Sequence, residues 1–199
     1  MKSKLPQYPL RLAVFDLDYT IWQPEMYQLY GRPKLVPTPS NLSSNLVKET
    51  RTKHDGMILV DSKRTNTPMR VFPGAASALY EIKELRKQGY DIQAAVSSRT
   101  DEPEWARMCM DHLVLEDGVT TLAECFGRRV EIGYNDKSLH LQRLHQATGV
   151  PYHEMCFFDN EHYNIKDVQR KLPAVKCFYT PNGMSEKAWE EAKRAFRWE

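Results

Sequence analysis

Residues 12–20, LAVFDLDYT, form a short apolar run that breaks abruptly at Asp18-Tyr-Thr. A continuous apolar run of this length, ended by polar residues, predicts a buried strand that leads into a loop. Two carboxylates, Asp16 and Asp18, and the hydroxyl of Thr20 would then stand where the strand ends. The stretch therefore predicts a buried strand that delivers acidic side chains to one edge of a sheet.

Downstream, short apolar runs alternate with segments of helical periodicity. Pro73-Gly74 opens a helix that Gly89 closes, as expected of proline at a helix start and glycine after its end. Continuously apolar strands that alternate with helices predict a parallel sheet with helices on both faces, an α/β fold of three layers. The remaining strands are predicted at 92–96, 130–132, 155–158 and 174–179, and the remaining helices at 102–115, 138–148, 164–172 and 185–198.

The segment from residue 23 to residue 70 is irregular and contains five prolines. Two short extended candidates, 57–60 and 69–72, lie on either side of the polar segment 61–68. Such a pattern predicts a hairpin or flap rather than a helical module. The whole chain, 1–199, is thus predicted to be one α/β domain with a flap insertion at about 23–70.

Composition excludes several classes of protein. Hydrophobic residues make up 41% and charged residues 27%, which is ordinary for a globular protein, and a net charge of +2 without a Lys/Arg run gives no indication of a nucleic-acid partner. The four cysteines are scattered, which predicts reduced structural thiols. The first ten residues lack the apolar core of a signal peptide, and no run of 18 apolar residues occurs. We therefore expect a soluble cytoplasmic protein with no membrane contact.

Polar side chains follow three of the predicted strands. Besides the first strand, Ser97 and Ser98 end the second, Asp159-Asn160 follows a later one, and Lys137 begins a helix between them. Ligands of doubly wound sheets bind beyond the carboxyl ends of the strands, so we expect these groups to meet. Carboxylate and amide oxygens suit Mg²⁺, a lysine and a serine hydroxyl suit phosphoryl oxygens, and a carboxylate can attack phosphorus. Together they predict phosphoryl transfer.

These motifs resemble the haloacid dehalogenase superfamily. Phe15-Asp-Leu-Asp-Tyr-Thr is similar to its first motif, D-x-D-x-T, and the serine before Arg99, Lys137 and Phe157-Phe-Asp-Asn are similar to its second, third and fourth. The strings FDLDYTIW, SSRT, HLQRLHQATGVP and FFDNEHYNI resemble the magnesium-dependent phosphatase 1 family more closely. The resemblance implies a magnesium-dependent phosphatase without a large cap domain, because 99–136 is taken up by a core helix and strand.

The resemblance also implies roles for individual residues. Asp16 would be the nucleophile that becomes phosphorylated, and Asp18 the general acid and base. Ser98 and Lys137 would hold the phosphoryl group, with Ser98 favoured over Ser97 by its position next to Arg99. Thr20, which supports the first loop, and Arg99 are expected on the substrate-binding side.

Magnesium is expected on Asp16, on the backbone carbonyl of Asp18, and on Asp159 or Asn160. The fourth motif of the family commonly carries two adjacent acids, whereas this chain has Asp159-Asn160. An amide oxygen still ligates magnesium, although the site then carries one negative charge fewer. Which of the two residues makes the direct contact is left open by the sequence.

An open site admits both phosphoproteins, including those with phosphotyrosine, and small phosphosugars, so both remain candidate substrates. The enzyme alternative is a phosphomutase, which the missing cap disfavours because a mutase must shield its intermediate from water. The alternative from another class is a phosphate- or metal-sensing protein without turnover. Tyr19 and Trp22 are expected to wall the pocket, and His140 and His145, five residues apart, are expected at the surface or between helices.

Overall fold

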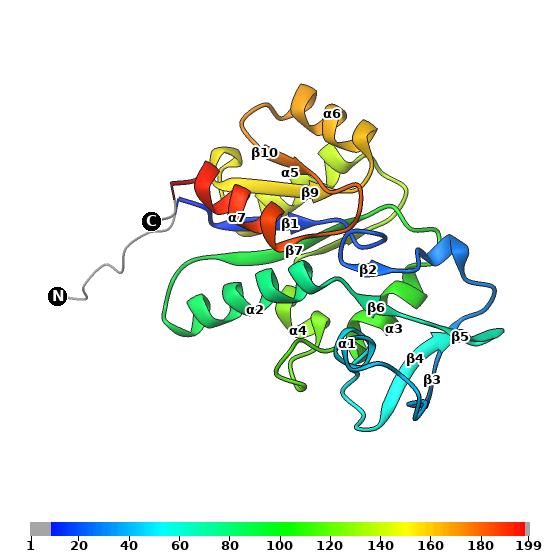
Figure 1. Ribbon diagram of the computed structural model, residues 1–199. Coiled ribbons are helices and arrows are strands. Elements are labelled where there is room, and N and C mark those ends of the chain that lie inside the picture. The colour runs from blue at the N-terminus through cyan, green and yellow to red at the C-terminus, as the bar shows by residue number, and fades with distance from the viewer. Residues whose placement is uncertain (1–8, 198–199) are drawn as a thin grey trace.

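Five parallel strands form the central sheet, in the order β10–β9–β1–β7–β8 (Figure 1). The computed structural model describes residues 9–197. Chain order reverses at β1, because β7 and β8 lie to one side of it and β9 and β10 to the other. The strands are β1 (Leu12–Phe15), β7 (Gln93–Ser98), β8 (Val130–Ile132), β9 (Met155–Asp159) and β10 (Lys176–Tyr179).

Helices cover both faces of the sheet. Successive side chains of β1 point to opposite faces. Ala13 and Phe15 therefore pack into the larger apolar core, whereas Leu12 and Val14 pack into the smaller one. This arrangement confirms the predicted three-layer α/β fold with a central parallel sheet. The larger core is covered by α2 (Pro73–Lys87), α3 (Pro103–His112), α4 (Leu122–Phe126) and α7 (Glu186–Ala195), and the smaller by α5 (Lys137–Thr148) and α6 (His162–Lys171).

The insertion forms two small antiparallel sheets beside the central one (Figure 1). At its root, β2 (Trp22–Gln23) pairs with β6 (Arg70–Val71), and between them lie the short helices η1 (Met26–Gln28) and α1 (Ser44–Glu49). The second sheet has the order β3–β4–β5, with β3 at Pro33–Pro37, β4 at Met57–Asp61 and β5 at Arg64–Pro68.

Several local predictions differ from the structure, and strands β2 and β3 and helix α1 of the insertion were not predicted at all. The polar segment 61–68 was expected to separate two strands, but most of it is strand β5, whose first three residues face solvent at the edge of the sheet. An exposed edge strand needs no apolar alternation, so its polar sequence gave no strand signal. Helix α4 was not predicted, because five residues between Thr121 and Gly127 are too few to show helical periodicity.

The predicted ends of the other elements agree with the structure to within a few residues. The last helix was expected to reach Trp198, which lies outside the described residues, and α7 ends at Ala195. All four cysteines are free thiols, with Cys109, Cys125 and Cys156 buried. A membrane-spanning helix is absent from residues 9–197.

Candidate active site

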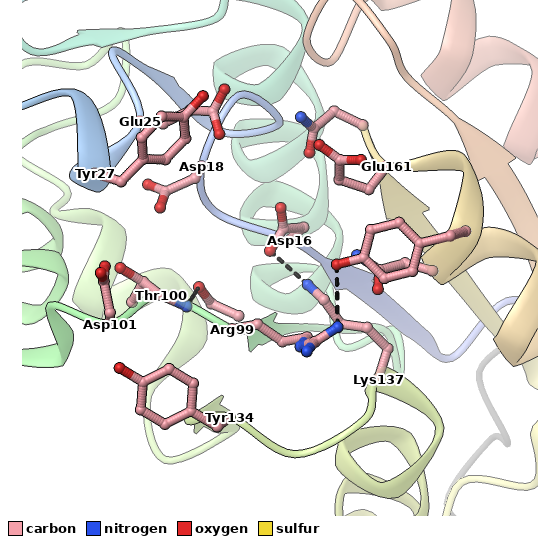
Figure 2. Close-up of a pocket in the computed structure, with 14 residues that line it drawn as sticks. Asp16, Asp18, Glu25, Tyr27, Arg99, Thr100, Asp101, Tyr134, Lys137 and Glu161 are labelled. Atoms are coloured by element: carbon pink, nitrogen blue, oxygen red, sulfur yellow. Dashed lines mark hydrogen bonds and ion pairs between the residues drawn. The ribbon is translucent and has the colours of Figure 1, made fainter.

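The carboxyl ends of β1, β7 and β9 surround a cavity of about 420 Å³ (Figure 2). Asp16 follows β1 directly, and its backbone N–H donates to the carbonyl of Phe158 in β9 at 2.9 Å. Parallel pairing of β1 with both neighbours thus sets the three strand ends at one level. The lining includes six of the predicted site residues, namely Asp16, Asp18, Ser98, Arg99, Lys137 and Asn160.

Lys137, the first residue of α5, is buried at the floor of the cavity. Its ammonium donates to Asp16 Oδ1 at 2.5 Å and to the carbonyl of Ser97 at 2.6 Å, and it lies 3.0 Å from Asp159 Oδ2. Burial by itself lowers the pKa of Lys137, but the two carboxylates outweigh it and the pKa is raised. The side chain is therefore a fixed positive charge beside Asp16.

Asp159 is fully buried, and its carboxylate is occupied by partners within the protein. Besides Lys137, it accepts hydrogen bonds from Asn164 Nδ2 at 3.1 Å and from the backbone N–H of Glu161 at 2.8 Å. These contacts bind Asp159 to Lys137 and to the start of α6. In this geometry Asp159 anchors the lysine.

Three polar groups converge on the side of Asp16 opposite Lys137. The side-chain amide of Asn160 lies 3.1 Å from the backbone carbonyl oxygen of Asp18 and 3.3 Å from Asp16 Oδ2, so that its N–H can donate to both oxygens. If the amide turns so that its oxygen faces these two oxygens, the three acceptors would repel one another unless a cation lay among them. Magnesium binds oxygens at about 2.0–2.1 Å in octahedral geometry, which sets neighbouring ligands about 3 Å apart. The residues present therefore fit a magnesium ion held by one carboxylate, one carbonyl and one amide.

The electrostatics of the metal-free site agree with this fit. Burial raises the pKa of Asp16, and Lys137 offsets only part of that effect. A second positive charge beside Asp16 would lower its pKa and favour the ionised carboxylate. Within residues 9–197 there is no cluster of three or more His, Cys, Asp or Glu side chains able to bind a metal.

Asp18 projects into the cavity from a tight loop after β1. Tyr19 adopts a left-handed backbone conformation at φ 51°, and its N–H bonds the carbonyl of Trp22 at 2.8 Å. The indole N–H of Trp22 donates to Asp18 Oδ1 at 2.9 Å. Burial nevertheless raises the pKa of Asp18, which suits a group that must carry a proton. Tyr19 and Trp22 are absent from the lining, so the expectation that they wall the pocket is wrong; Trp22 instead orients Asp18.

Of the two serines, Ser98 lines the cavity and accepts a hydrogen bond from the N–H of Thr100 at 3.3 Å. Ser97 points to the other face of β7, toward His140. Arg99 lies at the cavity wall, where its guanidinium donates to the hydroxyl of Tyr163 at 3.0 Å. Thr20 is fully buried and does not line the cavity, so its side chain is not placed to touch a substrate.

The rim of the cavity holds residues that sequence reasoning missed. Three tyrosines are more than half exposed, and three acids, Glu25, Asp101 and Glu161, stand among them (Figure 2). They come from the insertion, from loops and from the start of α6, where no strand end or periodic pattern marks them. In the sequence, only closeness to Asp159-Asn160 could have indicated a rim residue, and this applies only to Glu161 and the residues next to it. The tyrosines are Tyr27, Tyr134 and Tyr163.

Comparison with known proteins agrees with this geometry. Residues 7–199 match the family model described as acid phosphatase. The chain is 30% identical to human magnesium-dependent phosphatase 1 over 186 residues, covering 94% of this chain and 86% of the relative. It is 26% identical to a HAD-like hydrolase superfamily protein of Schizosaccharomyces pombe, covering 80% of each chain.

A solved structure shows the same fold at lower identity. A haloacid dehalogenase-like family hydrolase from Xanthomonas campestris superposes with a TM-score of 0.53 at 13% identity, covering 94% of this chain and 92% of that one. The family match spans nearly the whole sequence, and the strand-end residues occupy the places that its motifs predict. The chain therefore belongs to the acid phosphatase family of the haloacid dehalogenase superfamily.

Proposed function

We propose that this protein is a magnesium-dependent phosphatase that hydrolyses phosphate monoesters through a phosphorylated Asp16. One observation carries the proposal: the two oxygens of Asp16 face different partners. Oδ1 accepts from Lys137, and Oδ2 lies beside the side-chain amide of Asn160, which also contacts the carbonyl of Asp18. The carboxylate of Asp16 thus lies between a fixed ammonium and the groups that would hold magnesium, at the floor of an open cavity. This placement suits attack on phosphorus.

In the first step Asp16 attacks the phosphorus atom, and the bond from phosphorus to the leaving oxygen breaks. Asp18 gives its proton to that oxygen. Lys137 and Ser98 hold phosphoryl oxygens as charge spreads over them. Asp16, Asn160 and the carbonyl of Asp18 would hold magnesium, which would supply further neutralisation of this charge.

In the second step water attacks the phosphorus of the aspartyl-phosphate. Asp18, now deprotonated, takes a proton from that water, inorganic phosphate leaves, and Asp16 is regenerated. No cap shields the cavity in the described part of the chain, so water reaches the intermediate and hydrolysis is favoured over return of the phosphoryl group to a second substrate.

The rim supports two substrate classes. Exposed tyrosines at three points of the opening favour an aromatic leaving group, such as the side chain of phosphotyrosine, through ring stacking. The carboxylates of Glu25, Asp101 and Glu161 also accept hydrogen bonds from sugar hydroxyls, which supports a small phosphosugar. We further propose that the substrate is a phosphorylated small molecule or a phosphoprotein. The protein would act on it in the cytoplasm, without a nucleic-acid or membrane partner.

The direct test is hydrolysis of phenyl phosphate with a chelator and with added magnesium. We expect turnover in magnesium, less than about one hundredth of it in chelator, and recovery when magnesium is restored, because charge neutralisation by the metal contributes several kcal/mol. Phosphotyrosine peptides and a panel of sugar phosphates then separate the two substrate classes. No turnover with any phosphate ester in magnesium would contradict the enzyme and favour a phosphate-sensing protein.

A second prediction concerns Asn160. Replacing it with leucine removes the amide oxygen while keeping the shape, and is expected to raise the magnesium concentration for half-maximal activity by at least about tenfold. Asn160→Asp restores the missing negative charge and is expected to lower that concentration. Asn45→Leu, the same change at an exposed position on α1, serves as control. Equal magnesium requirements for all three variants would remove Asn160 from the metal site and return Asp159 to consideration.

A further inference from the structure

His140 is a buried polar residue that lies behind the cavity and not in it. It is 1% exposed and stands three residues after Lys137 on α5, so both side chains face the sheet. It does not line the cavity. The expectation that His140 lies at the surface or between helices is therefore wrong, because α5 packs this face of its first turn directly against β7.

The imidazole contacts the same residue that holds the lysine. Nδ1 of His140 lies 3.1 Å from Ser97 Oγ, and the backbone carbonyl of Ser97 accepts from Lys137 Nζ at 2.6 Å. Ser97 therefore contacts α5 twice: its side chain bonds His140, and its backbone carbonyl accepts from Lys137. The next residue is Ser98, whose hydroxyl lines the cavity. A shift at Ser97 would move both groups proposed to hold the phosphoryl oxygens.

His140 makes this contact without adding charge. Burial lowers its pKa to about 4, and the neighbouring cations Lys137, Arg143 and Arg99 add to that effect. At neutral pH the ring is therefore uncharged. Its other nitrogen, Nε2, is buried without a hydrogen-bond partner among the described residues. An unpaired acceptor is tolerated better than an unpaired donor, which favours the tautomer with the proton on Nδ1, donated to Ser97.

We propose that His140 is a positioning residue for the phosphoryl site, one that clamps the end of β7 through Ser97 so that Lys137 and Ser98 keep their geometry. This role rests on the proposed function, since it assigns His140 to the support of groups that bind the phosphoryl moiety. The carboxylates of Asp16 and Asp159 hold Lys137 from the other strands, and the Ser97 carbonyl is the contact that ties it to β7.

The test compares His140→Leu, which fills the space without hydrogen bonding, with His140→Asn, which keeps an N–H at the position of Nδ1. His140→Leu is expected to lower kcat for phenyl phosphate roughly tenfold to hundredfold, since small misplacements of catalytic groups have effects of this size. It should also weaken binding of inorganic phosphate to the magnesium-loaded protein, measured by calorimetry, at unchanged magnesium affinity. His140→Asn should restore both to within about threefold of wild type.

His145→Leu is the matched control, because His145 also lies on α5 but is half-buried and bonds the carbonyl of Val150, outside the cavity lining. It should leave kcat and phosphate binding unchanged. Wild-type phosphate affinity in His140→Leu, or equal losses in His140→Leu and His145→Leu, would overturn the positioning role. Phosphate binding is measured without turnover, so it tests the positioning role separately from the proposed function. Failure of the proposed function would instead appear as phosphate binding without hydrolysis in the wild type.

Discussion

Asp16→Asn is expected to reduce kcat for phenyl phosphate by at least about a thousandfold, since removal of a covalent nucleophile leaves only binding and electrostatic contributions. The amide keeps the size of the side chain but lacks the negative oxygen that attacks phosphorus. Lys137 retains the carboxylate of Asp159 at 3.0 Å and the carbonyl of Ser97, so the floor of the cavity keeps its charge pairing. The loss should therefore appear in activity and not in folding.

Asp111→Asn is the control for this experiment, because Asp111 is exposed on α3 and does not line the cavity. Thermal unfolding of both variants reports on folding, and mass spectrometry of the intact protein excludes deamidation of the introduced amide back to a carboxylate. A phosphorylated species trapped on wild type and missing from Asp16→Asn would identify the attacking group. Residual activity of Asp16→Asn within tenfold of wild type would place the nucleophile elsewhere.

Lys137→Met is expected to have the largest effect on stability, lowering the free energy of unfolding by about 3–5 kcal/mol at neutral pH without magnesium. This is the usual cost of removing one partner from a buried ion pair. Without the ammonium, Asp16 and the fully buried Asp159 face each other with no counter-charge in the protein. Activity should be lost as well, since the phosphoryl group loses its fixed cation.

The stability loss in Lys137→Met should depend on pH with a defined sign. Burial already raises the pKa of Asp16 in the wild type, and removal of Lys137 raises it further. A carboxyl whose folded pKa exceeds its unfolded value of about 4 binds its proton more tightly when folded, so stability falls as pH rises through the folded pKa. Urea unfolding in chelator should therefore show a smaller loss near pH 5 than near pH 8. Added magnesium should recover part of it.

Lys34→Met provides the comparison, because Lys34 is exposed on β3 and far from the cavity lining. Its unfolding free energy should stay within about 0.5 kcal/mol of wild type at both pH values. A loss in Lys137→Met that is the same at both pH values would show that the two carboxylates are not responsible for the destabilisation.

The side chains that the sequence correctly placed at the cavity share one structural position. Asp16, Ser98 and Asn160 each stand where an apolar strand ends, and parallel pairing brings such ends to one edge. The strand pattern alone therefore predicted which residues meet. It could not separate the role of Asp159 from that of Asn160, because adjacent residues differ only in the direction of their side chains, which the turn after β9 decides.

The residues that the sequence failed to locate depend on contacts between distant segments. Tyr27 and Tyr134 reach the rim from the insertion and from the loop before α5, with no periodic pattern to mark them. Trp22 was expected at the pocket wall, yet it became a buried hydrogen-bond donor to Asp18 through a turn with left-handed backbone geometry. His140 was misplaced for a similar reason, since the packing of α5 on β7 is a property of the assembled layers.

The pairing of β2 with β6 closes the insertion into a module whose two ends meet. Trp22 lies opposite Val71 and Gln23 opposite Arg70, so the chain leaves and re-enters the central domain at nearly the same place. Changes at the exposed positions of β5 leave this junction intact, whereas Leu59 of β4 packs into the larger core and is constrained by it. Only the first residues past this junction, Glu25 and Tyr27, extend to the rim. Divergence of the module can thus remodel the surroundings of the site while the phosphoryl chemistry stays fixed.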